Sequence, residues 1–204
     1  MAAFWQNEDG VTLVEFAIVL AVFLLLFFGL IDYGRMGFTY VMNQKAVQMA
    51  ARTAIVRPPA CAGVPTKHTR TSSIDNTQPI PDFGSSCGTA NSCQNFSLTC
   101  QGDLTNPTVA EIWANVRPLL PVSAQPSNLY FTYRKIDELG FLGGPFTPLV
   151  TVELKNQTFE FVSPLSEFAA MAGATSAGDF DADFVMPTLT VTLPGEDLAQ
   201  GTSG

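Results

Sequence analysis

The chain has 204 residues, which favours a single domain with an anchor; 47% of the residues are hydrophobic and only 14% are charged. The net charge of −8 comes from residues 58–204, which carry six basic and fourteen acidic side chains, whereas residues 1–57 carry four of each. An acidic head lacks the clustered Lys and Arg that contact phosphates, so the composition excludes nucleic acid as a partner.

An apolar run covers residues 11–31 and contains one charge, Glu15. Its 21 residues are enough to cross the hydrocarbon core of a bilayer as a helix. A helix satisfies every backbone polar group internally, as lipid requires. Good helix formers follow until Pro58 and Pro59 end the pattern. We expect a transmembrane and extended helix over 11–57, after a short polar leader at 1–10.

One alternative to this helix and one expected irregularity in it follow from the sequence. A cleaved secretory signal would have an apolar core of about 7–15 residues and a small-x-small cleavage site, but this run is longer and no Ala-x-Ala follows it. Gly34 weakens the helix relative to Ala, so a bend or a melted turn is expected near it.

Four cysteines lie within 40 residues, in a loop rich in Pro, Ser, Thr, Asn and Gly: Cys61, Cys87, Cys93 and Cys100. Such a cluster predicts two disulfides in an oxidising compartment, with three possible pairings. Zinc is the alternative, although the sequence has no Cys-x-x-Cys pair and only one histidine, His68. We expect a disulfide-rich loop over 58–107.

The remaining chain predicts an α+β head over 108–193 and a flexible tail over 194–204. Thr108 and Glu111 fit a capping box at the start of a helix that Pro118 and Pro121 end. Alternating or β-rich runs predict an antiparallel sheet that this one packing helix covers. The expected strands are 129–134, 150–155, 158–162 and 184–193, and a short helix is expected over 166–172.

The sequence offers no set of catalytic residues. A single histidine makes a Ser-His-Asp or Cys-His device hard to build, and no Gly-x-x-x-x-Gly-Lys phosphate loop is present. Asp179, Asp181 and Asp183 are spaced like the start of a calcium loop, but the Gly and Glu that should follow are missing. A looser calcium site remains the alternative to a solvated acidic loop. We expect no enzyme activity, no metal and no cofactor.

The start of the apolar run carries a family resemblance. Gly10, four further residues and then Glu15-Phe16 resemble the processing site of type IV prepilins and pseudopilins. The runs LIDYGR at 30–35 and AARTA at 50–54 resemble the rest of the amino-terminal signature of TadE-like pseudopilins of the Tad/Flp (type IVb) pilus system.

The resemblance implies a minor pseudopilin, a structural component of pilus assembly. A prepilin peptidase would cut after Gly10, so that Val11 becomes the new amino terminus. Glu15 would then pair with the amine of Val11 on a neighbouring subunit. The implied partners are the peptidase, other pilins and pseudopilins of the same system, and the inner-membrane assembly platform.

The implied location is the bacterial inner membrane, crossed by a single span, with the head in the periplasm. The resemblance also allows the protein to be incorporated into an extracellular pilus. The cysteines agree with this orientation, whereas the positive-inside rule, applied to Arg35, Lys45 and Arg52, opposes it. The competing hypothesis is an unprocessed, single-pass, membrane-anchored periplasmic binding or sensor domain, in which the Gly-to-Glu spacing arose by chance.

Overall fold

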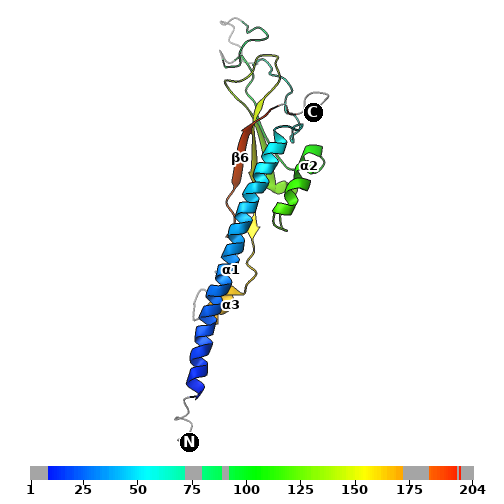
Figure 1. The fold of residues 1–204 in the computed structure, drawn as a ribbon. Helices are drawn as coiled ribbons and strands as arrows, with labels where there is room; N and C mark the ends of the chain where they lie inside the picture. The colour runs from blue at the N-terminus through cyan, green and yellow to red at the C-terminus, as the bar shows by residue number, and fades with distance from the viewer. Residues whose placement is uncertain (1–8, 72–79, 89–91, 172–183, 197, 199–204) are drawn as a thin grey trace. The chain divides into compact units, whose positions relative to one another are not determined.

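The computed structural model describes residues 9–71, 80–88, 92–171, 184–196 and 198 (Figure 1). The chain forms two compact units: an anchor unit, residues 1–40 and 158–186, and a head unit, residues 41–157 and 187–204. Helix α1 (Asp9–Ala54) contributes to both units and is helical over all 46 residues. The melted turn expected at Gly34 is therefore wrong, because the α-helical hydrogen bonding continues through this glycine.

A four-stranded antiparallel sheet forms the centre of the head unit, in the order β1-β2-β3-β6. Its strands are β1 (Ser97–Gln101), β2 (Leu129–Lys135), β3 (Pro148–Leu154) and β6 (Leu189–Pro194). Alternate side chains of the two central strands are buried, as the period of two in the sequence predicts. The predicted antiparallel sheet is thus confirmed.

Two helices cover the buried face of this sheet. Helix α2 (Pro107–Val116), which continues into a 3-10 turn, η2 (Arg117–Leu119), contributes Val109, Ile112 and Val116 to the core. The carboxyl-terminal part of α1 packs into the same core through a narrow stripe of mostly small residues: Ala46, Val47, Ala50, Ala51 and Ala54. Small side chains let the helix backbone approach the sheet closely. The sequence predicted only the first of these two covering helices.

The predicted loop over 58–107 and the predicted strands at 158–162 and 184–193 differ in detail from the structure. Strand β1 lies at the end of the loop and pairs with β2 along its whole length. A second 3-10 turn, η3 (Pro126–Asn128), leads into β2. Strands β4 (Thr158–Phe159) and β5 (Phe184–Val185) pair with each other in the anchor unit and not with the sheet of the head. Pro187, which lacks an amide donor, separates β5 from β6.

The segment expected to be a flexible tail includes described residues. The Gly195 amide donates to Pro148 O at 2.7 Å, and the Glu196 amide donates to Ile55 O at 3.1 Å. Leu198 is buried in the core of the head unit. Residues 197 and 199–204 lie outside the described residues, as does the leader up to residue 8.

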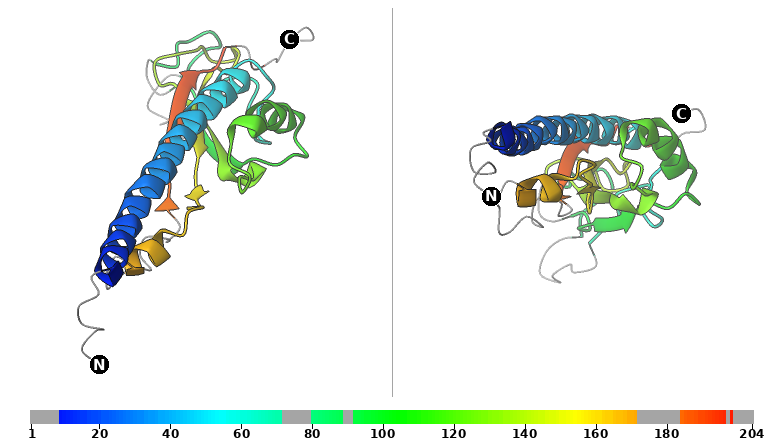
Figure 2. Two further views of the ribbon diagram at one scale, coloured as in Figure 1. Left: turned by 60° about the horizontal axis from the view of Figure 1, so that its bottom comes forward. Right: turned by 90° about the horizontal axis from the view of Figure 1, so that it is seen from below.

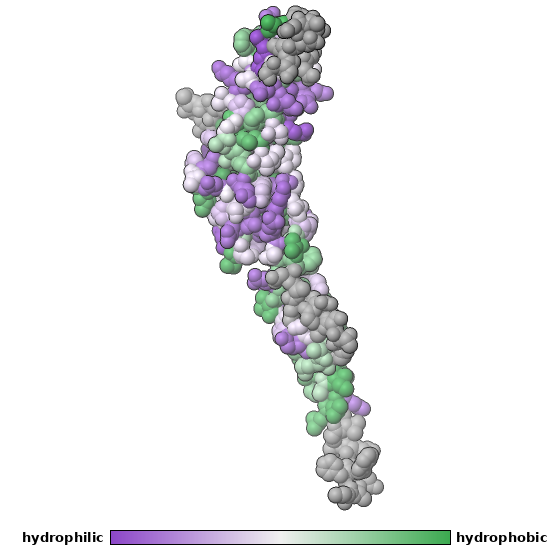
Figure 3. Space-filling model, turned by 180° about the vertical axis from the view of Figure 1, so that it is seen from behind, coloured by the Kyte–Doolittle hydropathy of each residue, from purple (hydrophilic) through white to green (hydrophobic). Residues whose placement is uncertain are grey.

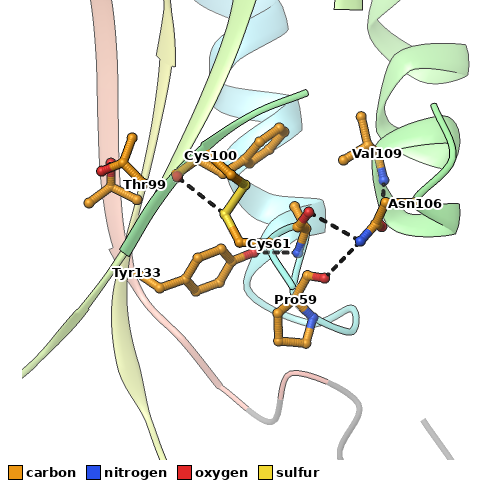
Figure 4. The surroundings of a disulfide bond; sticks show 10 residues. Pro59, Cys61, Thr99, Cys100, Asn106, Val109 and Tyr133 are labelled. Carbon is orange, nitrogen blue, oxygen red and sulfur yellow. Dashed lines mark hydrogen bonds between the residues drawn. A yellow bond between two sulfur atoms is a disulfide. The ribbon is translucent and has the colours of Figure 1, made fainter. Parts of the chain in front are cut away.

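Asn106 joins the segment after α1 to the start of α2 (Figure 4). Its Oδ1 accepts from the amides of Thr108 and Val109, so Asn106 is the N-cap of α2. Its Nδ2 donates to Pro59 O and Ala60 O, both at 3.1 Å. The expected Thr108–Glu111 capping box is therefore wrong: the Thr108 hydroxyl donates instead to Pro58 O at 2.8 Å, and Glu111 pairs with Arg57 at 2.9 Å.

The register of β3 can be tested with two neighbouring substitutions. Val152 is fully buried, whereas Thr151 lies on the opposite face, where its hydroxyl is 2.9 Å from that of Thr192. Val152→Asp should destabilise the head by more than about 4 kcal/mol, because it buries an unpaired carboxylate. Thr151→Asp should cost about 1 kcal/mol or less. Equal losses of melting temperature for the two variants would contradict the register.

The two roles of Asn106 can be separated by comparing two substitutions. Asn106→Ala should lower the free energy of unfolding by about 2–3 kcal/mol, since it removes a helix cap and two donors to carbonyls. Asn106→Ser keeps a side-chain acceptor for the α2 amides and loses the donors to Pro59 O and Ala60 O without placing a charge beside them, so its loss should be distinctly smaller. Urea denaturation of the full chain measures both. If the serine variant is no more stable than the alanine variant, Asn106 does not act as a cap.

Candidate functional site: the apolar part of helix α1 and the residues that follow it

The first part of α1 is long and apolar enough to cross a membrane, by length and composition. Most of its large hydrophobic side chains are exposed, among them Leu13, Phe16, Val19, Phe23, Leu26 and Leu30. Figure 3 shows hydrophobic surface over this part of the helix. Such a surface on a protein in water would be a large apolar patch, which normally marks a membrane or protein contact.

The predicted processing residues lie at the start of this helix. Gly10 and Val11 are in its first turn, and Glu15 and Phe16 follow one turn later with exposed side chains. Within the described part of the chain no cationic side chain forms an ion pair with Glu15; the described ion pairs lie elsewhere. The structure thus leaves this carboxylate on an apolar helix surface, available to a group from outside the described residues.

Three residues of the LIDYGR run hold one segment of the anchor unit against α1. Asp32 is only 1% exposed; its Oδ1 accepts from Arg35 Nη1 at 2.8 Å, and its Oδ2 accepts from the Ser163 amide at 3.0 Å. The Tyr33 ring lies edge-on to Phe161, with ring centres 5.8 Å apart. The Arg35 guanidinium lies 5.6 Å from the centre of the Phe159 ring.

These contacts give the LIDYGR run a structural role that the sequence did not reveal. The sequence predicted only an Asp32–Arg35 pair, because three residues apart on a helix is a local relation. The contacts with residues 159–163 join positions more than 120 residues apart, which no local pattern can predict.

All four cysteines are in disulfides, with Cys61 joined to Cys100 and Cys87 joined to Cys93. The first bridge connects the segment after α1 to strand β1, close to the Tyr133 hydroxyl, which accepts from the Ala60 amide at 2.9 Å (Figure 4). The second joins two cysteines six residues apart within the predicted disulfide-rich segment. The structure therefore selects one of the three pairings that the sequence left open.

His68 lies beside the Cys87–Cys93 bridge, and one nitrogen of its ring is within 4.8 Å of both sulfur atoms. The disulfide uses both sulfurs, so neither offers the thiolate that zinc requires. A cavity of about 310 Å³ adjoins His68 and is lined by Gly63, Pro65, Lys67, Thr69, Gln94, Phe96 and Phe146. This lining contains no carboxylate or nucleophile paired with a base. The acidic loop at Asp179, Asp181 and Asp183 lies outside the described residues.

The imidazole of His68 is buried and packs edge-on against Phe146, with ring centres 5.1 Å apart. Among the described residues its Nε2 has no hydrogen-bond partner. Burial lowers the pKa of His68 below its usual value of 6.5, and the positive charge of Lys135 lowers it further. His68 is therefore neutral in the folded head at neutral pH.

This depressed pKa predicts a pH-dependent stability. The unfolded chain binds a proton at His68 below about pH 6.5 while the folded head resists it, so stability is complete above that pH and falls as the pH drops further. The slope should reach at most about 1.4 kcal/mol per pH unit. Melting temperatures between pH 7.5 and 5.5 measure it. His68→Phe keeps a ring against Phe146 and should remove most of the slope; identical slopes in both proteins would contradict the assignment.

The amino-terminal segment is similar to a known family. The family model of TadE-like proteins matches residues 10–52, which begin at Gly10 and include Glu15, the LIDYGR run and the start of the AARTA run. The comparison with curated proteins gives no match. The comparison with solved structures gives none either. The expected TadE-like resemblance is thus confirmed over this segment.

Proposed function

We propose that this chain, whose amino-terminal segment is TadE-like, is a minor pseudopilin of a Tad/Flp-type pilus that a prepilin peptidase processes after Gly10. The match over residues 10–52 carries the proposal and supports a component related to the Tad pilus. The processing step, the minor role and the partners go beyond that match. They rest on the Gly10-to-Glu15 spacing at the start of a membrane-capable helix.

The exposed apolar part of α1 supports assembly as well as anchoring. Between Phe16 and Ile31 the helix carries no charge, and most of its large side chains are exposed. Such a surface is compatible with lipid and equally with the apolar helices of neighbouring subunits. A helix of this kind can leave the bilayer and enter a filament without exposing new charges.

The free-energy cost of placing the Glu15 carboxylate in a membrane span supports the same proposal. A carboxylate within a span costs up to about 2.5–3.5 kcal/mol at mid-bilayer on insertion scales and less near the interface. Cleavage after Gly10 would create an ammonium group at Val11, and pairing with a neighbour's ammonium would offset this cost. The Val11 amine of the same chain lies one helical turn before Glu15, so pairing within a chain competes with pairing between subunits.

The two disulfides support a head in an oxidising compartment, which in this proposal is the periplasm. Arg35, Lys45 and Arg52 would favour the opposite orientation under the positive-inside rule. Arg35, however, is paired with the buried Asp32, and large domains translocate largely regardless of charge. We therefore place the protein in the bacterial inner membrane with its head in the periplasm, from where it enters the pilus.

The proposal predicts different effects for two substitutions near the cleavage site. Gly10→Leu should block processing, since the peptidase of the resembled family needs a residue without a side chain at the cut, and a membrane-bound precursor should accumulate. Glu15→Ala should permit cleavage and membrane insertion but reduce piliation, because the partner of the Val11 amine is lost. The mass of the protein in native membranes and counts of pili measure these effects.

The opposite outcomes of these experiments would contradict the proposal. A wild-type protein that still carries residues 1–10 in native membranes favours the unprocessed, membrane-anchored binding or sensor domain. Normal pili in Glu15→Ala cells, with normal processing, contradict the role of this carboxylate in assembly. Glu15→Gln is the matched control, because it keeps the side-chain size and removes the charge.

A further inference from the structure

The chain leaves the head unit at residue 158 and returns to it after residue 186; we call this segment of the anchor unit the excursion. Strands β4 and β5 pair antiparallel and close its base, with Thr158 opposite Val185 and Phe159 opposite Phe184. The base is held at the end of the apolar span by the contacts of Asp32, Tyr33 and Arg35 with residues 159–163. From there helix α3 (Leu165–Met171) lies beside the amino-terminal half of α1 (Figures 1 and 2).

Helix α3 covers a face of the apolar part of α1. The rings of Phe168 and Phe28 are stacked, with centres 5.5 Å apart, and Ala169 is 1% exposed. Met171 lines an apolar groove of about 370 Å³ together with Leu13, Val14, Ala17, Ile18 and Ala21. Ala21, only 4% exposed, is buried, whereas the other apolar side chains between residues 12 and 31 are exposed or half-buried.

The position of α3 along α1 conflicts with a bilayer around the span. Phe28 lies four residues before Asp32, or about 6 Å, and Ala21 lies eleven residues before it, or about 16 Å. Since the hydrocarbon core is about 30 Å thick, α3 would reach close to the midplane of the bilayer.

The composition of the excursion makes such a depth unfavourable. Glu167 on α3 is exposed, and residues 172–183, which follow, contain three aspartates. Carboxylates in hydrocarbon are costly. A helix of seven residues such as α3 also leaves most of its amides and carbonyls without an intrahelical partner, which lipid cannot satisfy. Lipid chains and α3 therefore compete for the same face of α1.

We propose that α3 is an intramolecular cover for the apolar helix, docked on the face of Ala21 and Phe28 when the span is outside the bilayer and displaced from it when the span is inserted. The β4–β5 base stays at the membrane surface in both states, because its partners Asp32, Tyr33 and Arg35 follow the span. The occupant of this face outside lipid is the chain's own segment, and the other faces remain open to neighbouring helices. The inference requires only that α1 enters a bilayer and does not depend on processing or on a pilus.

A thiol pair tests the two states in the full-length chain. Phe28→Cys with Phe168→Cys places two thiols on the facing helices, and the native disulfides are left oxidised. One sample of the purified protein is inserted into phosphatidylethanolamine–phosphatidylglycerol vesicles, and only the carbonate-resistant fraction is kept. The other sample is held in an amphipathic polymer, which keeps the protein soluble without a bilayer. A short bis-maleimide then reports the proximity of the two thiols by mass spectrometry.

The cross-link should form in the polymer, and its yield in vesicles should be lower by about tenfold or more, since unsatisfied backbone and charge oppose the docked state in lipid. The matched control is Leu26→Cys with Phe168→Cys: Leu26 is exposed on another face of α1, so its yield should be low in both samples. Equal yields of the first pair in both samples would show α3 docked inside the bilayer and overturn the proposal. A low yield of that pair in the polymer would overturn it as well, because the docked state would then require neighbouring subunits or be absent.

Discussion

Lipid offers no water to an unpaired amide or carbonyl, so the backbone of a membrane span must satisfy itself through one uninterrupted helix. Helix α1 meets this constraint from Asp9 to Ala54 and extends it into the head, where the same helix becomes part of a core. Its two ends differ only in side chains: large exposed apolar residues in the anchor unit, and a stripe of alanines with Val47 in the head unit. The sheet and α2 pack against the part of α1 in the head unit, and residues 159–163 are held by Asp32, Tyr33 and Arg35 of the same helix.

Local patterns in the sequence predicted the elements whose causes are local. Val150, Val152 and Leu154 alternate with polar residues, so the burial of one face of β3 followed directly. The apolar run at 11–31 predicted the membrane-capable helix, and four clustered cysteines predicted two bridges without their pairing. The Gly10-to-Glu15 spacing and the LIDYGR run pointed to the family that the comparison then matched.

The features that the sequence did not predict depend on partners distant in the chain. Strand β1 is short and gains its stability from five pairs with β2. Asn106 caps α2 through amides two and three residues away, but its bonds to Pro59 and Ala60 join it to a distant segment. The run at 158–162 reads as a strand of the main sheet, yet β4 pairs with β5 beside α1, since Asp32, Tyr33 and Arg35 hold that segment. Neither relation leaves a periodic signal.

The Cys61–Cys100 bridge has a mechanical consequence for a head unit that follows helix α1 in the chain. Its two cysteines are 39 residues apart in sequence, and one follows α1 while the other lies on an edge strand of the sheet. Without the bridge, tension on α1 that peeled the segment after it from the head could draw out about 115 Å of slack chain before reaching Cys100, because the Cys87–Cys93 bridge still shortens the loop. With the bridge, the load passes covalently from the segment after α1 to strand β1, and the intervening loop carries none of it. The oxidised head therefore transmits force as one body, whereas a reduced head would extend under the same load.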